Sequence, residues 1–233
     1  MLRSVEAALG AGHATLVRYC ATSDPAFDSA MATVDHVPGW FGEVNAAVFW
    51  AVIGELRPSV VLEIGSYLGR STVLIGLALE HFCKGGARLV SIDPHTGDRQ
   101  QLAALGLDAI NTADLFALHI AGSGVAHVVE AKTMTSDEAS ADWTDAIDLL
   151  FVDGWHSYEA VRADIRHFAT RLGPNGSVCF DDFDYPDVGR AVTDGCREAS
   201  LTLYGTVVGQ AWAGRVGKGP AALRRSIRCW ELW

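Results

Sequence analysis

The 233-residue sequence lacks the paired cysteines that mark many small zinc-binding and redox proteins. Its five cysteines are widely spaced and form no C-x-x-C pair, so neither a zinc knuckle nor a thioredoxin-like motif is predicted. Cys179 lies inside an apolar run and is expected to be a small core residue. Unpaired cysteines fit a reducing compartment, so we expect a cytoplasmic protein.

Long apolar runs and basic clusters are also missing. The longest purely apolar run, 46–53, is too short to cross a bilayer, and Glu6 stands where a signal peptide would have its apolar stretch. The net charge is −10 at pH 7, and the densest basic patch, RRSIR, is short. Proteins that bind nucleic-acid backbones need a basic surface. We therefore expect neither a membrane nor a nucleic acid as a partner.

The chain divides into a short amino-terminal segment and one larger unit. Its length and its 49% hydrophobic share allow one sizeable core. Residues 1–37 are rich in turn and helix-capping residues and are predicted to form a helical arm or lid, with 38–233 as the main domain. Residues 43–56 are apolar nearly all round and are predicted to form a buried helix.

From residue 60 onward, strand and helix patterns alternate. Apolar runs rich in β-branched residues predict strands at 60–65, 87–93, 125–131, 147–153 and 177–182. The clearest helix begins at Tyr158 and carries an apolar stripe as far as Leu172.

The carboxy-terminal part of the sequence adds two more strands. Residues 201–210 and 211–217 follow each other with no helix between them, which indicates an antiparallel pair. The fold class expected is α/β: a Rossmann-like, seven-stranded, mostly parallel sheet with a C-terminal antiparallel hairpin and helices on both faces. Such sheets bind ligands at the C-terminal ends of their strands.

A glycine-containing loop follows the first predicted strand. Its pattern is E-x-G-x-x-x-G-x-S, formed by Glu63, Gly65, Gly69 and Ser71. Gly65 can make a tight turn that lets backbone N–H groups face a ligand at the next helix. The loop is not G-x-G-x-x-G, which makes a nicotinamide enzyme less favoured. The alternative is a plain strand-to-helix turn that needs glycine.

An acidic residue, Asp93, follows the second predicted strand. A carboxylate there can accept hydrogen bonds from the two hydroxyls of a ribose. Together with the glycine loop, it indicates a nucleoside-containing ligand. The adenine of such a ligand would lie near the end of the third strand, where Lys132 is the candidate contact.

Three more carboxylates follow the fourth and fifth predicted strands: Asp153 and the pair Asp181-Asp182. If these strands are neighbours, their ends lie about 5 Å apart. Repulsion among three carboxylates is relieved by a cation or a shared proton, and oxygen ligands suit Mg²⁺. The alternative is that Asp182 or Asp184 only caps the following helix.

With these residues in place, the sequence resembles the class I S-adenosylmethionine-dependent methyltransferases. The carrying segments are VVLEIGSYLGRST, VSIDP, DLLFVDGWHSYEAVRADI and CFDDFDYPDVGRAV, within about 58–216. The string D-G-x-H-S-Y-E followed by D-D is similar to the branch of sugar O-methyltransferases in macrolide and aminocoumarin biosynthesis. The resemblance implies S-adenosyl-L-methionine (SAM) and Mg²⁺ as cofactors and a small-molecule hydroxyl as methyl acceptor.

The resemblance also implies roles for individual residues. Cofactor contacts are expected from the glycine loop and strand ends: Glu63, Gly65, Ser66, Gly69, Ser71, Asp93, Lys132 and Asp153. Metal ligands are expected at Asp153, Asp181 and Asp182. Relatives often have a second Asp where this sequence has Trp155. Either the general base moves to His156 or to a metal-bound carboxylate such as Asp153, or deprotonation needs little help. Trp155 would line the acceptor pocket, and Tyr158 is expected in the core.

Other functions remain open at this point. A metal-independent N- or C-methyltransferase would have the same fold. A non-catalytic protein could use residues 1–37 and the C-terminal CWELW to bind a partner. The apolar termini favour a homo-oligomer.

Overall fold

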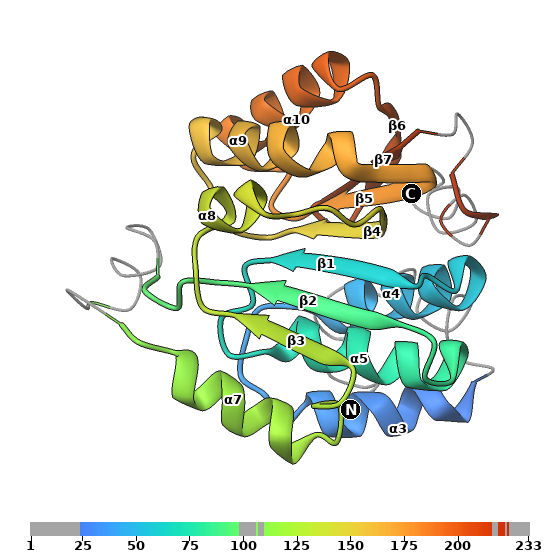
Figure 1. Ribbon diagram of the computed structural model, residues 1–233. Coiled ribbons are helices and arrows are strands. Elements are labelled where there is room, and N and C mark those ends of the chain that lie inside the picture. The colour runs from blue at the N-terminus through green and yellow to red at the C-terminus, as the bar shows by residue number, and fades with distance from the viewer. Residues whose placement is uncertain (1–23, 98–105, 107–109, 216–218, 222, 224–233) are drawn as a thin grey trace.

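The computed structural model describes residues 24–97, 106, 110–215, 219–221 and 223 (Figure 1). One seven-stranded sheet has the order β3-β2-β1-β4-β5-β7-β6, with β1 to β5 parallel and β7 antiparallel to both its neighbours. This confirms the predicted fold class. The strands are β1 Val60–Ile64, β2 Arg88–Ile92, β3 Val129–Lys132, β4 Ile147–Val152, β5 Leu172–Phe180, β6 Thr202–Val207 and β7 Gln210–Gly214.

Helices cover both faces of the sheet (Figure 1). Side chains alternate along a strand, so Leu149 and Phe151 of β4 face one core while Leu150 and Val152 face the other. The first core is closed by α3 Pro25–Val34, α4 Glu43–Leu56, α5 Arg70–Cys83 and α7 Ala113–Gly122. The second is closed by α8 Ser136–Ala141, α9 Tyr158–Phe168 and α10 Pro186–Glu198.

Several element boundaries predicted from the sequence differ from those observed. The strand expected at 125–131 is the shorter β3, and the helix expected to reach Leu172 ends at Phe168. A short 3₁₀ turn, Ala169–Arg171, follows, and Leu172 already pairs with Ile147 in the sheet. The ladder is irregular there, and a Cβ on Gly176 would lie 2.9 Å from the Ile147 carbonyl oxygen. Glycine thus lets β5 enter the sheet earlier than its apolar pattern indicates.

The part of the amino-terminal segment that the structure describes packs into the core. Phe27 and Val34 of α3 are buried, and Asp24 caps the helix while accepting a hydrogen bond from Trp50 Nε1 at 3.0 Å. The predicted arm or lid falls partly on residues 1–23, outside the described residues. Its role as a lid stays a prediction.

Arg70, at the start of α5, fixes the segment that follows α3. Its guanidinium donates to the carbonyl oxygens of Val34, Val37 and Phe41 and pairs with Asp35 at 2.9 Å. These bonds hold residues 34–41 next to the glycine loop.

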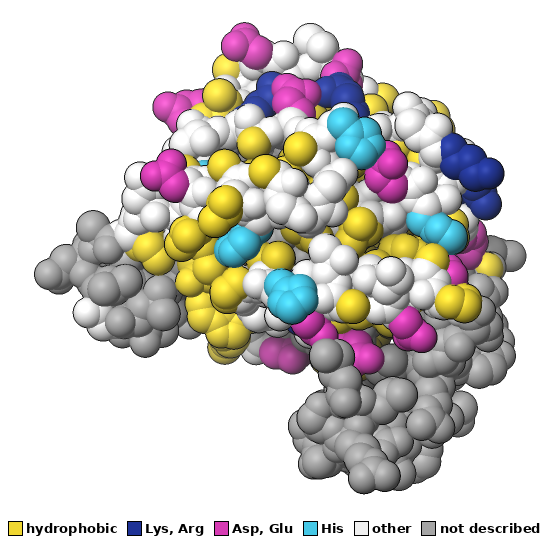
Figure 2. Space-filling view, turned by 90° about the horizontal axis from the view of Figure 1, so that it is seen from below, with side chains coloured by type: hydrophobic (Ala, Val, Ile, Leu, Met, Phe, Trp, Pro, Cys, Tyr) yellow, Lys and Arg dark blue, Asp and Glu magenta, His cyan; other side chains and the backbone are white. Residues whose placement is uncertain are grey.

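The face seen from below carries hydrophobic side chains interspersed with acidic and histidine side chains (Figure 2). Leu115 and Leu118 of α7 are exposed. Within the part of the chain that the structure describes, no helix is both long and apolar enough to span a membrane.

Candidate active site

The C-terminal ends of the parallel strands open into one cavity of about 970 Å³. It is lined by the residues that follow β1, β2, β4 and β5, by the segment 38–41 and by the β6–β7 turn. β1 lies between β2 and β4, so the glycine loop occupies the middle of this edge. The cavity therefore lies where doubly wound sheets bind their ligands.

Gly65 makes the turn that the sequence predicted. Its φ is +85°, and a Cβ at this position would lie 2.0 Å from the backbone oxygen of Asp153. The Asp153 amide in turn donates to the Ile64 carbonyl at 2.8 Å. Only glycine fits here, because the loops after β1 and β4 touch through their backbones.

Asp93 fastens the glycine loop to the end of β2. Its Oδ2 accepts hydrogen bonds from the amides of Ser66 and Tyr67, each at 2.8 Å, and its Oδ1 accepts from the His95 amide at 2.7 Å. Asp93, Ser66 and Tyr67 all line the cavity. The carboxylate is therefore oriented by the backbone before any ligand binds, and Oδ1 keeps one further lone pair.

Glu63 lies beneath the loop and is fully buried. Its carboxylate accepts hydrogen bonds from Ser71 Oγ at 2.6 Å, Thr72 Oγ1 at 2.5 Å and Ser91 Oγ at 3.1 Å. It does not line the cavity, whereas Ser71 does. Glu63, expected as a direct cofactor contact, is thus set back from the cavity and instead positions Ser71.

Burial raises the pKa of Glu63 to about 7, against the lowering effect of its hydroxyl donors. The folded protein therefore holds this proton more tightly than the unfolded chain, and stability falls as pH rises from about 4.5 to 7. Glu63→Gln removes this dependence. We expect variant and wild type to have similar melting temperatures at pH 5. At pH 8 the variant should melt at a higher temperature, and its free energy of unfolding should be larger by roughly 3 kcal/mol. The same difference in melting temperature between variant and wild type at both pH values would contradict this.

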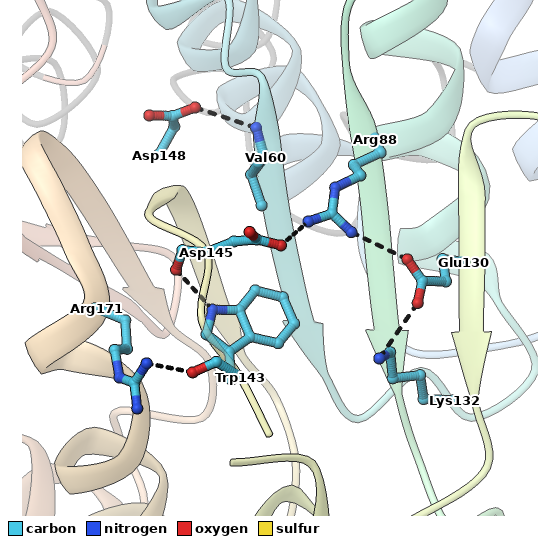
Figure 3. Close-up of polar contacts among 8 residues, drawn as sticks. All are labelled: Val60, Arg88, Glu130, Lys132, Trp143, Asp145, Asp148 and Arg171. Carbon is cyan, nitrogen blue, oxygen red and sulfur yellow. Dashed lines mark hydrogen bonds and ion pairs between the residues drawn. The ribbon is translucent and has the colours of Figure 1, made fainter. Parts of the chain in front are cut away.

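Two other expected cofactor contacts do not line the cavity. Lys132 points along the sheet to Glu130, with 3.2 Å between Nζ and Oε1 (Figure 3). Gly69 is the N-cap residue of α5 with φ +94°, and a Cβ there would meet Phe116 at 3.1 Å. Gly69 thus allows α7 to approach the loop. Lys132 belongs to a row of surface ion pairs that continues through Glu130 and Arg88.

The acidic residues after β4 and β5 converge, with one change from the expected set. Strands β4 and β5 are neighbours. Ligand atoms of Asp153, His156 and Asp182 all lie within 4.8 Å of one another, and His156 Nε2 is 2.8 Å from Asp182 Oδ2. Asp181 also lines the cavity, but His156 takes its place in this group. We call Asp153, His156 and Asp182 the carboxylate–histidine group.

Backbone conformation explains why Asp182 rather than Asp181 joins the group. Asp182 has φ +52°, a left-handed conformation that is uncommon outside glycine and redirects the side chain. No side chain caps α10, whose N-cap residue is Tyr185. The alternative in which Asp182 or Asp184 caps this helix is therefore wrong.

Electrostatic repulsion and burial act together on these carboxyls. Burial, and then the charges of Asp181 and Asp182, raise the pKa of Asp153 well above its usual range. Burial and the neighbouring Asp182 raise the pKa of Asp181 to about 6. Such shifts mark sites that favour a cation or hold a proton.

Tyr158 is structural, as expected. It packs against the second core, its hydroxyl donates to Asp194 Oδ2 at 3.0 Å, and the Arg190 guanidinium lies 4.8 Å from the centre of its ring. Tyr158 is also absent from the cavity lining.

Sequence reasoning missed several lining residues. Asn45 is nearly buried in α4, and its Oδ1 has no hydrogen-bond partner. Its signal was a lone amide inside an apolar helix. Asp164 of α9 is also buried, and burial raises its pKa to about 6. Trp40 stacks on Tyr67 with 5.2 Å between ring centres, a contact between distant segments that no local pattern indicates.

Comparison with known proteins agrees with this arrangement. The family model described as "Methyltransferase domain" matches residues 62–183, which contain the glycine loop, Asp93 and the carboxylate–histidine group. An uncharacterized protein of Acanthamoeba polyphaga mimivirus is 30% identical over 145 residues, which are 57% of this chain and 59% of that protein. The match thus spans less than two thirds of that relative's length.

Solved structures of low sequence identity share the fold. The O-methyltransferase NovP superposes with a TM-score of 0.63 at 12% identity, covering 76% of this chain and 83% of NovP. TomG from Streptomyces achromogenes, an O-methyltransferase of tomaymycin synthesis solved with SAM, gives 0.53 at 20%, covering 82% and 89%. A Bacillus cereus O-methyltransferase solved with S-adenosylhomocysteine gives 0.58 at 13%, covering 82% and 91%.

The family match covers the loops after β1, β2 and β4 and the start of the loop after β5, and the shared fold extends over most of the described chain. The chain therefore belongs to the methyltransferase domain family and has the class I fold of SAM-dependent methyltransferases.

Proposed function

We propose that the protein transfers a methyl group from SAM to a hydroxyl oxygen of a small molecule. The observation that carries this proposal is the placement of the carboxylate–histidine group in the same cavity as the glycine loop and Asp93. One end of the cavity can hold a nucleoside, and the other offers a proton acceptor. SAM-dependent O-methylation needs both.

The nucleoside end is assigned from the order of strands. Asp93 Oδ1 would accept a hydrogen bond from a ribose hydroxyl, and Ser66 and Ser71 face the same space. Beyond Asp93, toward α8 and α9, the cavity is lined by Thr135, Ser136, Asp137 and Asp164. The buried Asp164 carboxylate would accept a hydrogen bond from the adenine amino group.

SAM supplies a methyl carbon on a positively charged sulfur, and the reaction exchanges the C–S bond for a C–O bond while the hydroxyl releases a proton. In the absence of a bound cation, His156 would receive that proton on an imidazole nitrogen. Asp182, 2.8 Å from Nε2, would orient the ring and stabilise its charged form. The cavity walls hold the acceptor in line with the methyl carbon, which removes much of the entropic barrier.

A divalent cation fits the carboxylate–histidine group. Two carboxylates and one imidazole offer three ligand atoms within 4.8 Å. Burial first, and then repulsion from Asp181 and Asp182, raises the pKa of Asp153, and a cation would relieve that repulsion. Bound there, it would polarise the acceptor hydroxyl and lower its pKa. Mg²⁺ prefers oxygen ligands, and an imidazole ligand also suits Mn²⁺ or Zn²⁺.

A metal-independent reaction is the second candidate, favoured by the short contact between His156 and Asp182. That pair needs no cation to accept a proton, and such a site would also serve N- or C-methylation. In this case His156 is the general base, whereas in the first it is a metal ligand.

The test joins binding to turnover. Calorimetric titration with S-adenosylhomocysteine, once with Mg²⁺ and once with EDTA, should give micromolar binding in both, because the nucleoside end contains none of the carboxylate–histidine group. No binding in either condition would remove the methyltransferase proposal. Methyl transfer that stops in EDTA and returns with Mg²⁺ or Mn²⁺ supports the metal. Full activity in excess EDTA, lost in His156→Ala, supports the second candidate.

A further inference from the structure

Four exposed large apolar side chains line the cavity; one, Trp40, stacks on Tyr67, and the other three lie on the loops after β4, β5 and β6. Trp155 is 51% exposed, Tyr185 43% and Val208 39%, and all three line the cavity. Exposed large apolar side chains that gather at the mouth of a pocket indicate a ligand surface. We call these three residues the apolar rim.

The apolar rim is held in place by three loops that are tied together. Trp155 precedes His156 after β4, and the ring of Tyr185 lies 5.8 Å from that of His156 at 83°. The Tyr185 amide donates to the Asp182 carbonyl at 2.9 Å, within the loop after β5. That loop is joined to the β6–β7 turn, since the Phe183 amide donates to the Gly209 carbonyl at 2.7 Å.

Val208 occupies its position at a conformational cost. Its φ is +45°, and positive φ is strongly unfavourable for a β-branched residue. The next residue, Gly209, has φ +74°, so this two-residue hairpin turn is one that Asn-Gly usually fills. An apolar side chain kept against such strain at the mouth of a pocket indicates a function there.

The apolar rim favours an apolar acceptor, and the charge around the cavity restricts the acceptor further. Of the described lining residues, eight are carboxylates and one is a Lys or Arg: Asp93, Asp137, Asp153, Glu159, Asp164, Asp181, Asp182 and Asp184 against Arg70. The Arg70 guanidinium is already bonded to three backbone carbonyls and to Asp35. A divalent cation and the sulfonium of SAM would offset only part of the negative charge of these eight carboxylates, so an anionic acceptor would still meet repulsion.

We propose that the methyl acceptor is a flat aromatic compound with a ring hydroxyl, neutral or positively charged, and that the apolar rim holds its ring. This inference rests on the proposed O-methyltransferase function. Trp155 and Tyr185 contact the faces or edges of the ring and Val208 closes the mouth, so that the hydroxyl points to the carboxylate–histidine group. A phenol has a pKa near 10, so a histidine can deprotonate it more easily than it can an aliphatic alcohol.

Two matched pairs of probes test the two conditions separately. Catechol and trans-cyclohexane-1,2-diol carry the same neighbouring hydroxyls on a flat and on a puckered ring. Dopamine and 3,4-dihydroxyphenylacetate carry the same aromatic diol with a positive and with a negative side chain. We expect kcat/KM for methyl transfer to be at least about tenfold higher for the first member of each pair.

Variants link these preferences to the rim. In Trp155→Ala, the ratio of kcat/KM for catechol to kcat/KM for trans-cyclohexane-1,2-diol is expected to fall below about threefold, because the KM for catechol rises. Val208→Asn should lower aromatic kcat/KM several-fold while the melting temperature holds or rises, because Asn tolerates positive φ. The matched control is Leu115→Ala on α7, where the side chain is 49% exposed, close to the 51% of Trp155; it should change neither ratio.

The outcomes separate this inference from the proposed function. Failure to bind S-adenosylhomocysteine would remove the proposed function itself. Binding of that ligand combined with equal or better use of the puckered or anionic probe, or with no use of any of the four, would overturn the aromatic acceptor alone. Unchanged ratios in Trp155→Ala would overturn the role of the rim.

Discussion

Replacing Asp153 with asparagine is expected to reduce kcat for methyl transfer by roughly 10³-fold, while the affinity for S-adenosylhomocysteine changes less than about threefold. Asparagine keeps the shape of the side chain but removes the charge that a cation, or the protonated His156, requires. Stopped or continuous methyl-transfer assays give kcat, and calorimetry gives the affinity.

The same substitution should stabilise the protein. Burial and neighbouring carboxylates raise the pKa of Asp153, so the ionised form destabilises the fold, and this cost appears as pH rises through the usual range of a carboxyl toward neutrality and above. Asp153→Asn should therefore melt at a higher temperature than wild type at pH 8. A matched control is Asp187→Asn, whose carboxylate pairs with Arg190 on the exposed side of α10 and should leave kcat and melting unchanged. Unaltered turnover in Asp153→Asn would remove this residue from the reaction.

Gly65→Ala is expected to lower the free energy of unfolding by roughly 3 kcal/mol or more and to abolish measurable S-adenosylhomocysteine binding. The added methyl would stand 2.0 Å from the Asp153 backbone oxygen, so the loops after β1 and β4 must separate. Chemical denaturation and calorimetry measure the two effects.

Gly85→Ala measures the cost of backbone strain without a steric clash. Gly85 has φ +80°, nearly that of Gly65, yet no atom lies within 4 Å of its added Cβ. This control should cost only about 1 kcal/mol and leave ligand binding intact. Equal losses in the two variants would show that strain alone, and not contact between the loops, explains the need for Gly65.

Several helices, strands and helix caps could be predicted from local sequence. The helix expected at 43–56 is observed as Glu43–Leu56, and the strand expected at 60–65 as Val60–Ile64. Thr135 forms the capping box that its spacing to Glu138 indicates. These features depend on side-chain periodicity and on contacts between residues three or four positions apart, which a single sequence contains.

Positions of individual site residues were predictable only as far as strand ends. The sequence by itself determined that Gly65, Asp93 and Asp153 follow buried parallel strands, because apolar runs and the residues that end them are local signals. Their meeting in one cavity follows from the parallel sheet, whose C-terminal ends share an edge.

Only the tertiary structure decided which groups act together. Asp181 and Asp182 are adjacent in sequence, but the left-handed conformation of Asp182 joins it to His156, and no local pattern specifies that conformation for a non-glycine residue. Glu63 belongs to the same loop motif as Ser71, yet the three hydroxyls around it keep it out of the cavity. The apolar rim draws on three loops that are brought together by long-range strand pairing. Sequence periodicity specifies which face of an element is buried, whereas contacts between distant loops depend on strand order and register, which arise when the whole sheet assembles.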